Sequence, residues 1–137
     1  MGWVMLEKTK ILLVEDDIPL AQTLLILLAN AGCEAQAIHT GKEGLQLALK
    51  TKFDLIVLDI DLPDMTGFDI CAELKQRHFS YRTPVVFTSG RHSNEDKQRG
   101  FEVGAADYIT KPFGVEFAQR LLSHVKSKNE TSKTAMA

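Results

Sequence analysis

Carboxylate, hydroxyl and amine side chains stand where four short apolar runs of this sequence end. Glu15 and Asp16 follow the first run, and Asp59, Ser89 and Lys111 follow three later ones. Crowded carboxylates raise one another's pKa, and a divalent cation relieves their repulsion. Mg2+ prefers such hard oxygen ligands together with water and phosphate oxygens, and a lysine is a compact positive charge suited to a phosphoryl group. The set predicts phosphoryl transfer, which depends mostly on positioning and charge neutralisation.

Each of these residues alone has an ordinary explanation. An acidic cluster before a helix is often an N-cap with acids favoured by the helix dipole. A single serine or lysine at the end of a strand is a common loop residue. Their joint occurrence at four run ends favours the chemical interpretation. The expected acceptor is a carboxylate, because aspartyl phosphates are a known covalent type.

The elements that must position these groups alternate along the chain. The expected strands are residues 11–14, 34–39, 53–58, 84–87 and 107–110, and the expected helices are residues 18–31, 42–51, 68–77, 94–103 and 114–126. Such alternation predicts right-handed βαβ units and an α/β fold, with a doubly wound parallel sheet covered by helices on both faces. Ligands bind outside the carboxyl ends of such strands, so the polar groups should meet at one edge.

Length and composition agree with one globular domain. The chain has 137 residues, a net charge of −2 and 45% hydrophobic residues. This charge argues against a protein that coats nucleic acid, and no apolar run approaches the ~18 residues of a membrane-spanning helix. Cys33 and Cys71 lie in apolar segments and are expected to be core residues in a reducing compartment.

Four stretches occur in an order and spacing typical of one family. They are ILLVEDD at residues 11–17, DLIVLDIDLPDMTG at 54–67, TPVVFTSGR at 83–91 and GAADYITKPF at 104–113. The chain thereby resembles the receiver domain of two-component response regulators, and the resemblance covers residues 9–127. It implies a flavodoxin-like strand order 2-1-3-4-5. Residues 1–8 are then an N-terminal extension, and residues 128–137 a disordered tail or the start of a linker.

The resemblance also implies roles for the residues at the strand ends. Asp59 matches the phosphoacceptor, and Lys111 matches the lysine of the family pattern. Mg2+ would be held directly by Asp16 and Asp59, by the backbone carbonyl of Asp61, and by Glu15 through water. Asp17 would lie outside the site and open the first helix.

Two further residues match positions that change conformation in the receiver family. Ser89 matches the switch hydroxyl, so that Thr88 would point to the other face of the sheet, and Tyr108 matches the aromatic that moves with it. Gly90 stands where a small residue leaves room for the phosphoryl group. The Lys111–Pro112 bond is usually cis in the family.

The implied function is that of a cytoplasmic signalling protein rather than an enzyme. Its donor would be the phosphohistidine of a sensor histidine kinase or histidine phosphotransfer protein. Phosphorylation would act on an unknown output partner or domain, and a phosphorylation-dependent dimer is one form of output; no direct contact with nucleic acid or membrane is expected. The output face is expected on residues 94–103, 107–110 and 114–126. Charges on this face such as Lys97, Arg99 and Arg120 would be read by the partner.

Two other functions fit parts of the pattern. Asp59 and Asp61 mimic the Asp-x-Asp motif of phosphatases of the haloacid dehalogenase type, with Asp59 as nucleophile and Asp61 as acid. Motif order opposes this, because that family places its acidic pair near the end of the chain. A degenerate receiver that only binds partners is the other alternative, and the complete set of polar residues argues against it.

Overall fold

Five parallel strands form one sheet in this computed structural model, which describes residues 7–77 and 82–125. The strands are β1 (Lys10–Val14), β2 (Glu34–Ile38), β3 (Leu55–Asp59), β4 (Val85–Ser89) and β5 (Asp107–Thr110). Their order is β2-β1-β3-β4-β5, and every neighbouring pair is parallel. The predicted fold class and strand order are confirmed. The predicted tail, residues 128–137, and most of the predicted extension lie outside the described residues.

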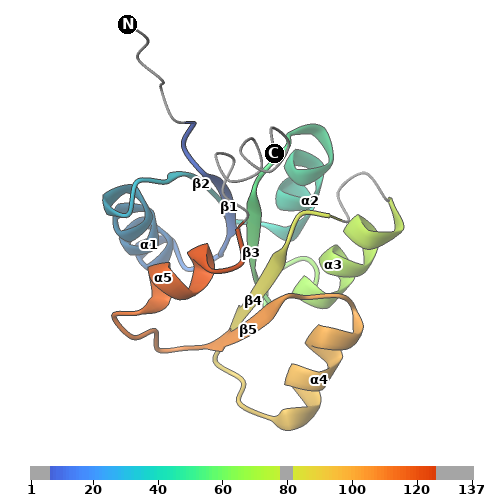
Figure 1. Ribbon diagram of the computed structural model, residues 1–137. Helices are drawn as coiled ribbons and strands as arrows, with labels where there is room; N and C mark the ends of the chain where they lie inside the picture. The colour runs from blue at the N-terminus through green and yellow to red at the C-terminus, as the bar shows by residue number, and fades with distance from the viewer. Residues whose placement is uncertain (1–6, 78–81, 126–137) are drawn as a thin grey trace, which may run out of the picture.

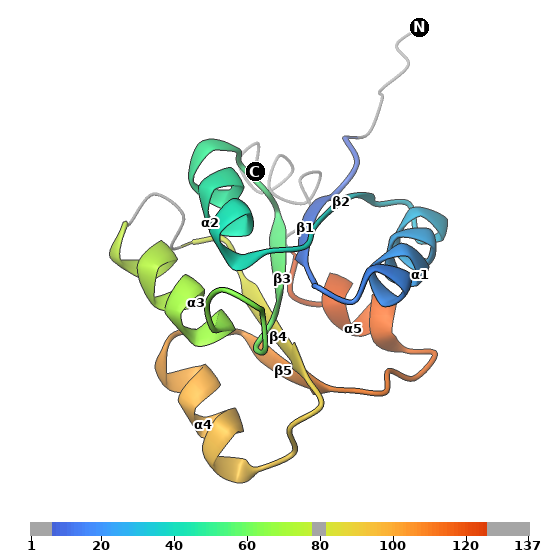
Figure 2. The same cartoon turned by 180° about the vertical axis from the view of Figure 1, so that it is seen from behind.

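Helices cover both faces of the sheet (Figure 1). They are α1 (Ile18–Asn30), α2 (Gly41–Lys50), α3 (Gly67–Gln76), α4 (Asn94–Glu102) and α5 (Phe117–Leu122). Helices α1 and α5 lie on one face and α2, α3 and α4 on the other, as the reverse view in Figure 2 also shows. Two apolar layers result, because successive residues of a strand point to opposite faces. Val86 belongs to the layer beneath α1 and α5, whereas Val85 and Phe87 belong to the opposite layer.

Local sequence signals explain where most helices begin. The side chains of Asp17, Thr40, Thr66 and Ser93 each accept a backbone N–H at the start of α1, α2, α3 and α4. Such caps satisfy donors that the helix itself leaves unpaired. After α4, Gly104 takes a φ of 102°, a conformation that glycine adopts without strain.

The last helix is shorter than the sequence predicted. The prediction was residues 114–126, whereas α5 spans only Phe117–Leu122. No side chain caps its first turn, and Gly114 and Val115 are weak helix formers. At the other end the Ser123 hydroxyl donates to the Arg120 carbonyl at 2.6 Å, which competes with a further helical turn. Residue 126 lies outside the described residues.

Both cysteines are buried in the core, as predicted. Over the residues that the structure describes, no helix combines the length and apolar character needed to cross a bilayer.

Candidate functional site

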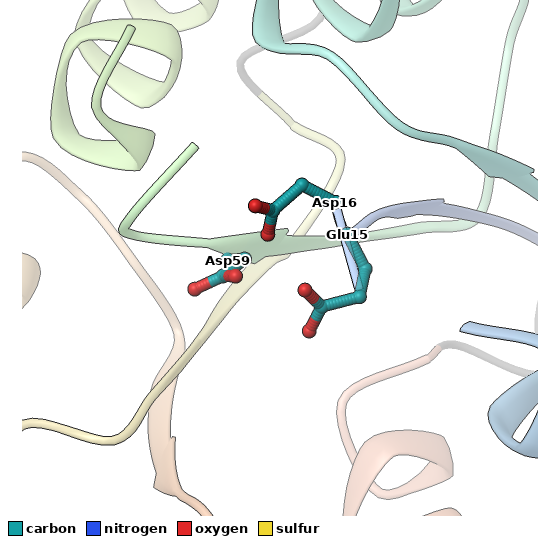
Figure 3. Close-up of side chains that lie close together, drawn as sticks. All are labelled: Glu15, Asp16 and Asp59. Carbon is teal, nitrogen blue, oxygen red and sulfur yellow. The ribbon is translucent and has the colours of Figure 1, made fainter. Parts of the chain in front are cut away.

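An acidic cluster forms where β1 and β3 end at the carboxyl edge of the sheet. Glu15 and Asp16 follow β1 directly, and Asp59 is the last residue of β3. Their side chains lie close together (Figure 3), and one carboxylate oxygen from each lies within 4.8 Å of the others. Glu15 is 1% exposed and Asp59 is 4% exposed, whereas Asp16 faces solvent. The sheet therefore brings together all three carboxylates that the sequence placed at this edge.

Lys111 joins this cluster from the end of β5. Its Nζ lies 2.7 Å from Glu15 Oε1 and 3.4 Å from Asp59 Oδ2. Burial alone would lower the pKa of Lys111, but the two carboxylates raise it above its usual value. The ammonium group is therefore held charged beside Asp59, where a group bound to that carboxylate would meet it. The Lys111–Pro112 peptide bond is cis, as expected.

Glu15 and Asp59 have pKa values displaced in opposite directions. Burial, followed by the neighbouring Glu15 carboxyl, raises the pKa of Asp59 to about 7. Burial also acts to raise the pKa of Glu15, but hydrogen bonds with Asp59, Lys111 and the Asp17 N–H outweigh it and lower that pKa. Burial and the facing Glu15 carboxyl therefore disfavour the ionised form of Asp59. A cation among the carboxylates would favour the ionised form instead.

The donor set fits a magnesium ion. Three carboxylates offer hard oxygen atoms within one small volume, and Mg2+ is commonly held by one or two carboxylates with water and phosphate completing its shell. Asp17 does not belong to the cluster, because its carboxylate accepts the Leu20 N–H at 3.1 Å and caps α1. The structure thus separates the two neighbouring aspartates in the way that the sequence predicted.

The hydroxyl of Ser89 is buried at the end of β4. It shares a face of the sheet with Phe87, whereas Thr88 shares the opposite face with Val86, by the alternation of the strand. Ser89 Oγ accepts the Arg91 N–H at 2.9 Å, and the Tyr108 hydroxyl donates to the Arg91 carbonyl at 3.1 Å. Ser89 and Tyr108 are therefore tied to the same backbone segment, the connection between β4 and α4.

Sequence reasoning missed Arg91 as a neighbour of the site. Its guanidinium contacts both carboxylate oxygens of Asp61, through Nη2 at 2.6 Å and Nε at 3.2 Å. The Asp61 N–H in turn donates to Asp59 Oδ1 at 3.2 Å. The only signal in the sequence was that Arg91 comes two residues after a strand end. The distance of 30 residues between the partners hid the ion pair.

Two charges of the expected output face are bound within the chain. Arg120 forms two hydrogen bonds with the Asp107 carboxylate, at 2.7 and 2.8 Å, and His124 Nε2 lies 2.9 Å from the same carboxylate. The guanidinium of Arg99 lies over the Phe68 ring, 4.4 Å from its centroid. Arg120 and Arg99 are thus engaged within the chain, and the expectation that a partner reads their charges stays a prediction.

Comparison with known proteins assigns the family. The sequence profile of the response regulator receiver domain matches residues 11–126. The chain is 36% identical over 119 residues to response regulator ArlR of Staphylococcus saprophyticus, covering 87% of this chain and 51% of that protein. It is 39% identical over 129 residues to transcriptional regulatory protein CiaR of Streptococcus pneumoniae, covering 91% of this chain and 56% of that protein. The chain thus spans about half the length of these curated relatives.

Solved structures agree in fold. Chemotaxis protein CheY4 of Vibrio cholerae superposes with a TM-score of 0.81 at 33% identity, covering 88% of this chain and 100% of that chain. The receiver domain of Francisella response regulator 1452 superposes with a TM-score of 0.80 at 30% identity, covering 85% of this chain and 96% of that chain. The relatives are response regulators and not phosphatases of the haloacid dehalogenase type. The chain belongs to the receiver domain family of two-component response regulators.

Proposed function

We propose that Asp59 accepts a phosphoryl group from the phosphohistidine of a sensor histidine kinase or a histidine phosphotransfer protein, in a reaction that requires Mg2+. The observation that carries the proposal is the position of Lys111 Nζ, between the Glu15 and Asp59 carboxylates. In the transfer an Asp59 oxygen forms a bond to phosphorus while the bond to the histidine nitrogen breaks. The electron pair of that bond leaves with the imidazole, and hydrolysis of the acyl phosphate resets the site.

The surrounding residues prepare Asp59 for this reaction. The attacking carboxylate must be ionised, and burial works against that by raising the pKa of Asp59 to about 7. Lys111 supplies a fixed positive charge at 3.4 Å, which offsets part of this effect and would neutralise a phosphoryl oxygen. Asp16, Asp59 and the Asp61 carbonyl would hold Mg2+ directly, and Glu15 through water. The bound ion would supply charge neutralisation for the transferred group.

Ser89 and Tyr108 are proposed to convert the modification into a change of shape. The Ser89 hydroxyl is buried at the end of β4, next to the strand that carries Asp59. A phosphoryl group on Asp59 would offer it a charged acceptor, and such hydrogen bonds are stronger than neutral ones. Movement of Ser89 would disturb the segment to which Tyr108 is also bonded. The change would then reach α4 and β5.

The wider role follows from this chemistry. The protein would act in the cytoplasm as a signalling component that catalyses only its own phosphorylation and dephosphorylation. Its phosphorylated form would control an output partner or domain through α4, β5 and α5, including by forming a dimer, without direct contact with nucleic acid or membrane.

A transfer experiment tests the proposal. The chain is mixed with a radiolabelled phosphohistidine donor, with Mg2+ or with EDTA, and the acid-labile label is counted. We expect Mg2+-dependent label on the wild-type chain and on the matched control Asp17→Asn, and none on Asp59→Asn. Undiminished label on Asp59→Asn would refute the assignment. Steady release of phosphate from small phosphate esters would point instead to a phosphatase.

A further inference from the structure

A second acidic residue of the β3–α3 connection makes an unusual contact away from the cluster. The two carboxylate oxygens of Asp64 accept the backbone N–H groups of Gly41 and Lys42, at 2.7 and 2.8 Å. These are the first two residues of α2, and the helix's own cap, Thr40, reaches only the Glu43 N–H, at 3.4 Å. Asp64 therefore fastens the tip of one connection to the start of a helix that precedes it by 23 residues.

The start of α2 and the β3–α3 connection are packed closely against each other at this contact. A Cβ added to Gly41 would lie 2.6 Å from Met65 Cγ and 3.1 Å from Asp64 Oδ1, so the connection rests directly on the helix. The two N–H groups lower the pKa of Asp64, and the helix dipole favours a negative charge there. An ionised carboxylate with two charge-assisted bonds gives the connection a defined position.

The base of the same connection is also fixed. The Gly67 N–H donates to the Ile60 carbonyl at 2.9 Å, and Asp61 and Thr66 form an antiparallel bridge. A Cβ on Gly67 would lie 2.7 Å from the Asp59 carbonyl oxygen, so α3 begins in contact with the backbone of the acceptor residue. Residues 59–67 thus form a short loop that is fixed at two places. Its two ends are joined by the Gly67–Ile60 hydrogen bond, and Asp64 in its middle is bonded to α2.

We propose that Asp64 is a positioning residue for the metal: by holding the β3–α3 connection on α2, it places the Asp61 carbonyl where the ion needs it. The inference rests on the proposed function, in which that carbonyl is a ligand. Asp64 itself is not one of the three carboxylates of the cluster in the described part of the chain. Residues that orient metal ligands in this way typically alter affinity by about 10- to 100-fold when they are removed.

The test compares Mg2+ affinity with stability in matched variants. Mg2+ is titrated into each chain by calorimetry or by following amide resonances, and the free energy of unfolding is measured in urea without metal. Asp64→Ala should bind Mg2+ about tenfold more weakly. Thr40→Ala removes the cap at the same helix end but leaves the connection attached, and should bind almost normally. Asp64→Asn, which keeps one oxygen acceptor, should fall between wild type and Asp64→Ala.

Two further variants separate position from charge. Asp69→Asn removes an exposed negative charge from the first turn of α3 and should leave affinity unchanged, whereas Gly41→Ala keeps every charge but pushes the connection away and should weaken binding. Normal affinity in folded Asp64→Ala, or in Gly41→Ala if the former does not fold, would overturn the inference. Equal loss in Asp69→Asn would also do so. A wild-type chain that binds Mg2+ yet never accepts phosphate would refute the proposed function instead.

Discussion

At the scale of single residues, neighbouring aspartates differ because of where their side chains point. Asp16 lies beside Glu15 and Asp59 in the acidic cluster, whereas Asp17 is engaged by the Leu20 N–H. Both residues lie in the connection between β1 and α1, but Asp17 directly precedes the helix and caps it. The resemblance to receiver domains implied this division, because it places the acidic pair directly after the last valine of the first strand.

The two aspartates should therefore have opposite effects when changed. Asp16→Ala removes a ligand and should weaken Mg2+ binding by about tenfold or more, while Asp17→Ala should bind normally and lose ~1 kcal/mol of stability with its cap. Titration of the metal and urea unfolding measure the two effects separately. Equal losses of affinity would show that the register at the end of β1 is wrong.

At the scale of elements, local signals predicted strands and helix starts better than contacts between loops. The strands and the starts of α1 to α4 could be read, to within a residue or two, from short windows of sequence. The Arg91–Asp61 ion pair and the attachment of Asp64 to α2 could not, because they join loops distant in sequence. The end of α5 was also missed, since Ser123 diverts a backbone carbonyl in a way that periodicity does not reveal.

The register of β4 yields a prediction about the switch. Ser89 Oγ accepts the Arg91 N–H, in the segment whose Arg91 carbonyl accepts the Tyr108 hydroxyl, whereas Thr88 is paired with Asp59 inside the sheet. We therefore expect Ser89, and not Thr88, to couple phosphate on Asp59 to Tyr108. A charge-assisted hydrogen bond of ~2 kcal/mol in one state shifts a two-state equilibrium about thirtyfold. Ser89→Ala should accept phosphate yet show weakened resonance shifts at Tyr108 and in α4 on adding beryllofluoride and Mg2+. Thr88→Ala should switch normally; the reverse result would contradict the register.

At the scale of the whole molecule, a partly exposed network of hydrogen bonds joins the last strand to the last helix. Asp107 on β5 accepts hydrogen bonds from Arg120 and lies 2.9 Å from His124 Nε2. The pKa of Asp107 is lowered to about 2: burial acts to raise it, but bonds with Arg120 and His124 outweigh burial. The sequence placed Arg120, and the strand that carries Asp107, on the expected output face. It did not predict their ion pair, because that pair depends on how α5 packs.

The lowered pKa predicts how stability depends on pH. Because Asp107 has a lower pKa folded than unfolded, its contribution is complete above pH 3.8 and is lost as the pH falls towards about 2. We expect the loss to be about 1 kcal/mol, since Arg120 is partly exposed and solvent screens the pair. Urea unfolding at successive pH values should show a steeper decline for wild type than for Asp107→Asn over this range. Parallel curves would contradict the assignment.

Chemical mapping shows directly whether the phosphoryl group resides on Asp59. The chain is phosphorylated by a phosphohistidine donor with Mg2+ and reduced with borohydride, which converts an acyl phosphate of aspartate into homoserine. The peptides are then sequenced by mass spectrometry. Residence of the phosphoryl group on Asp59 predicts homoserine at position 59 alone, and only after phosphorylation. Homoserine at position 16 or 61 with an unchanged Asp59 would contradict it.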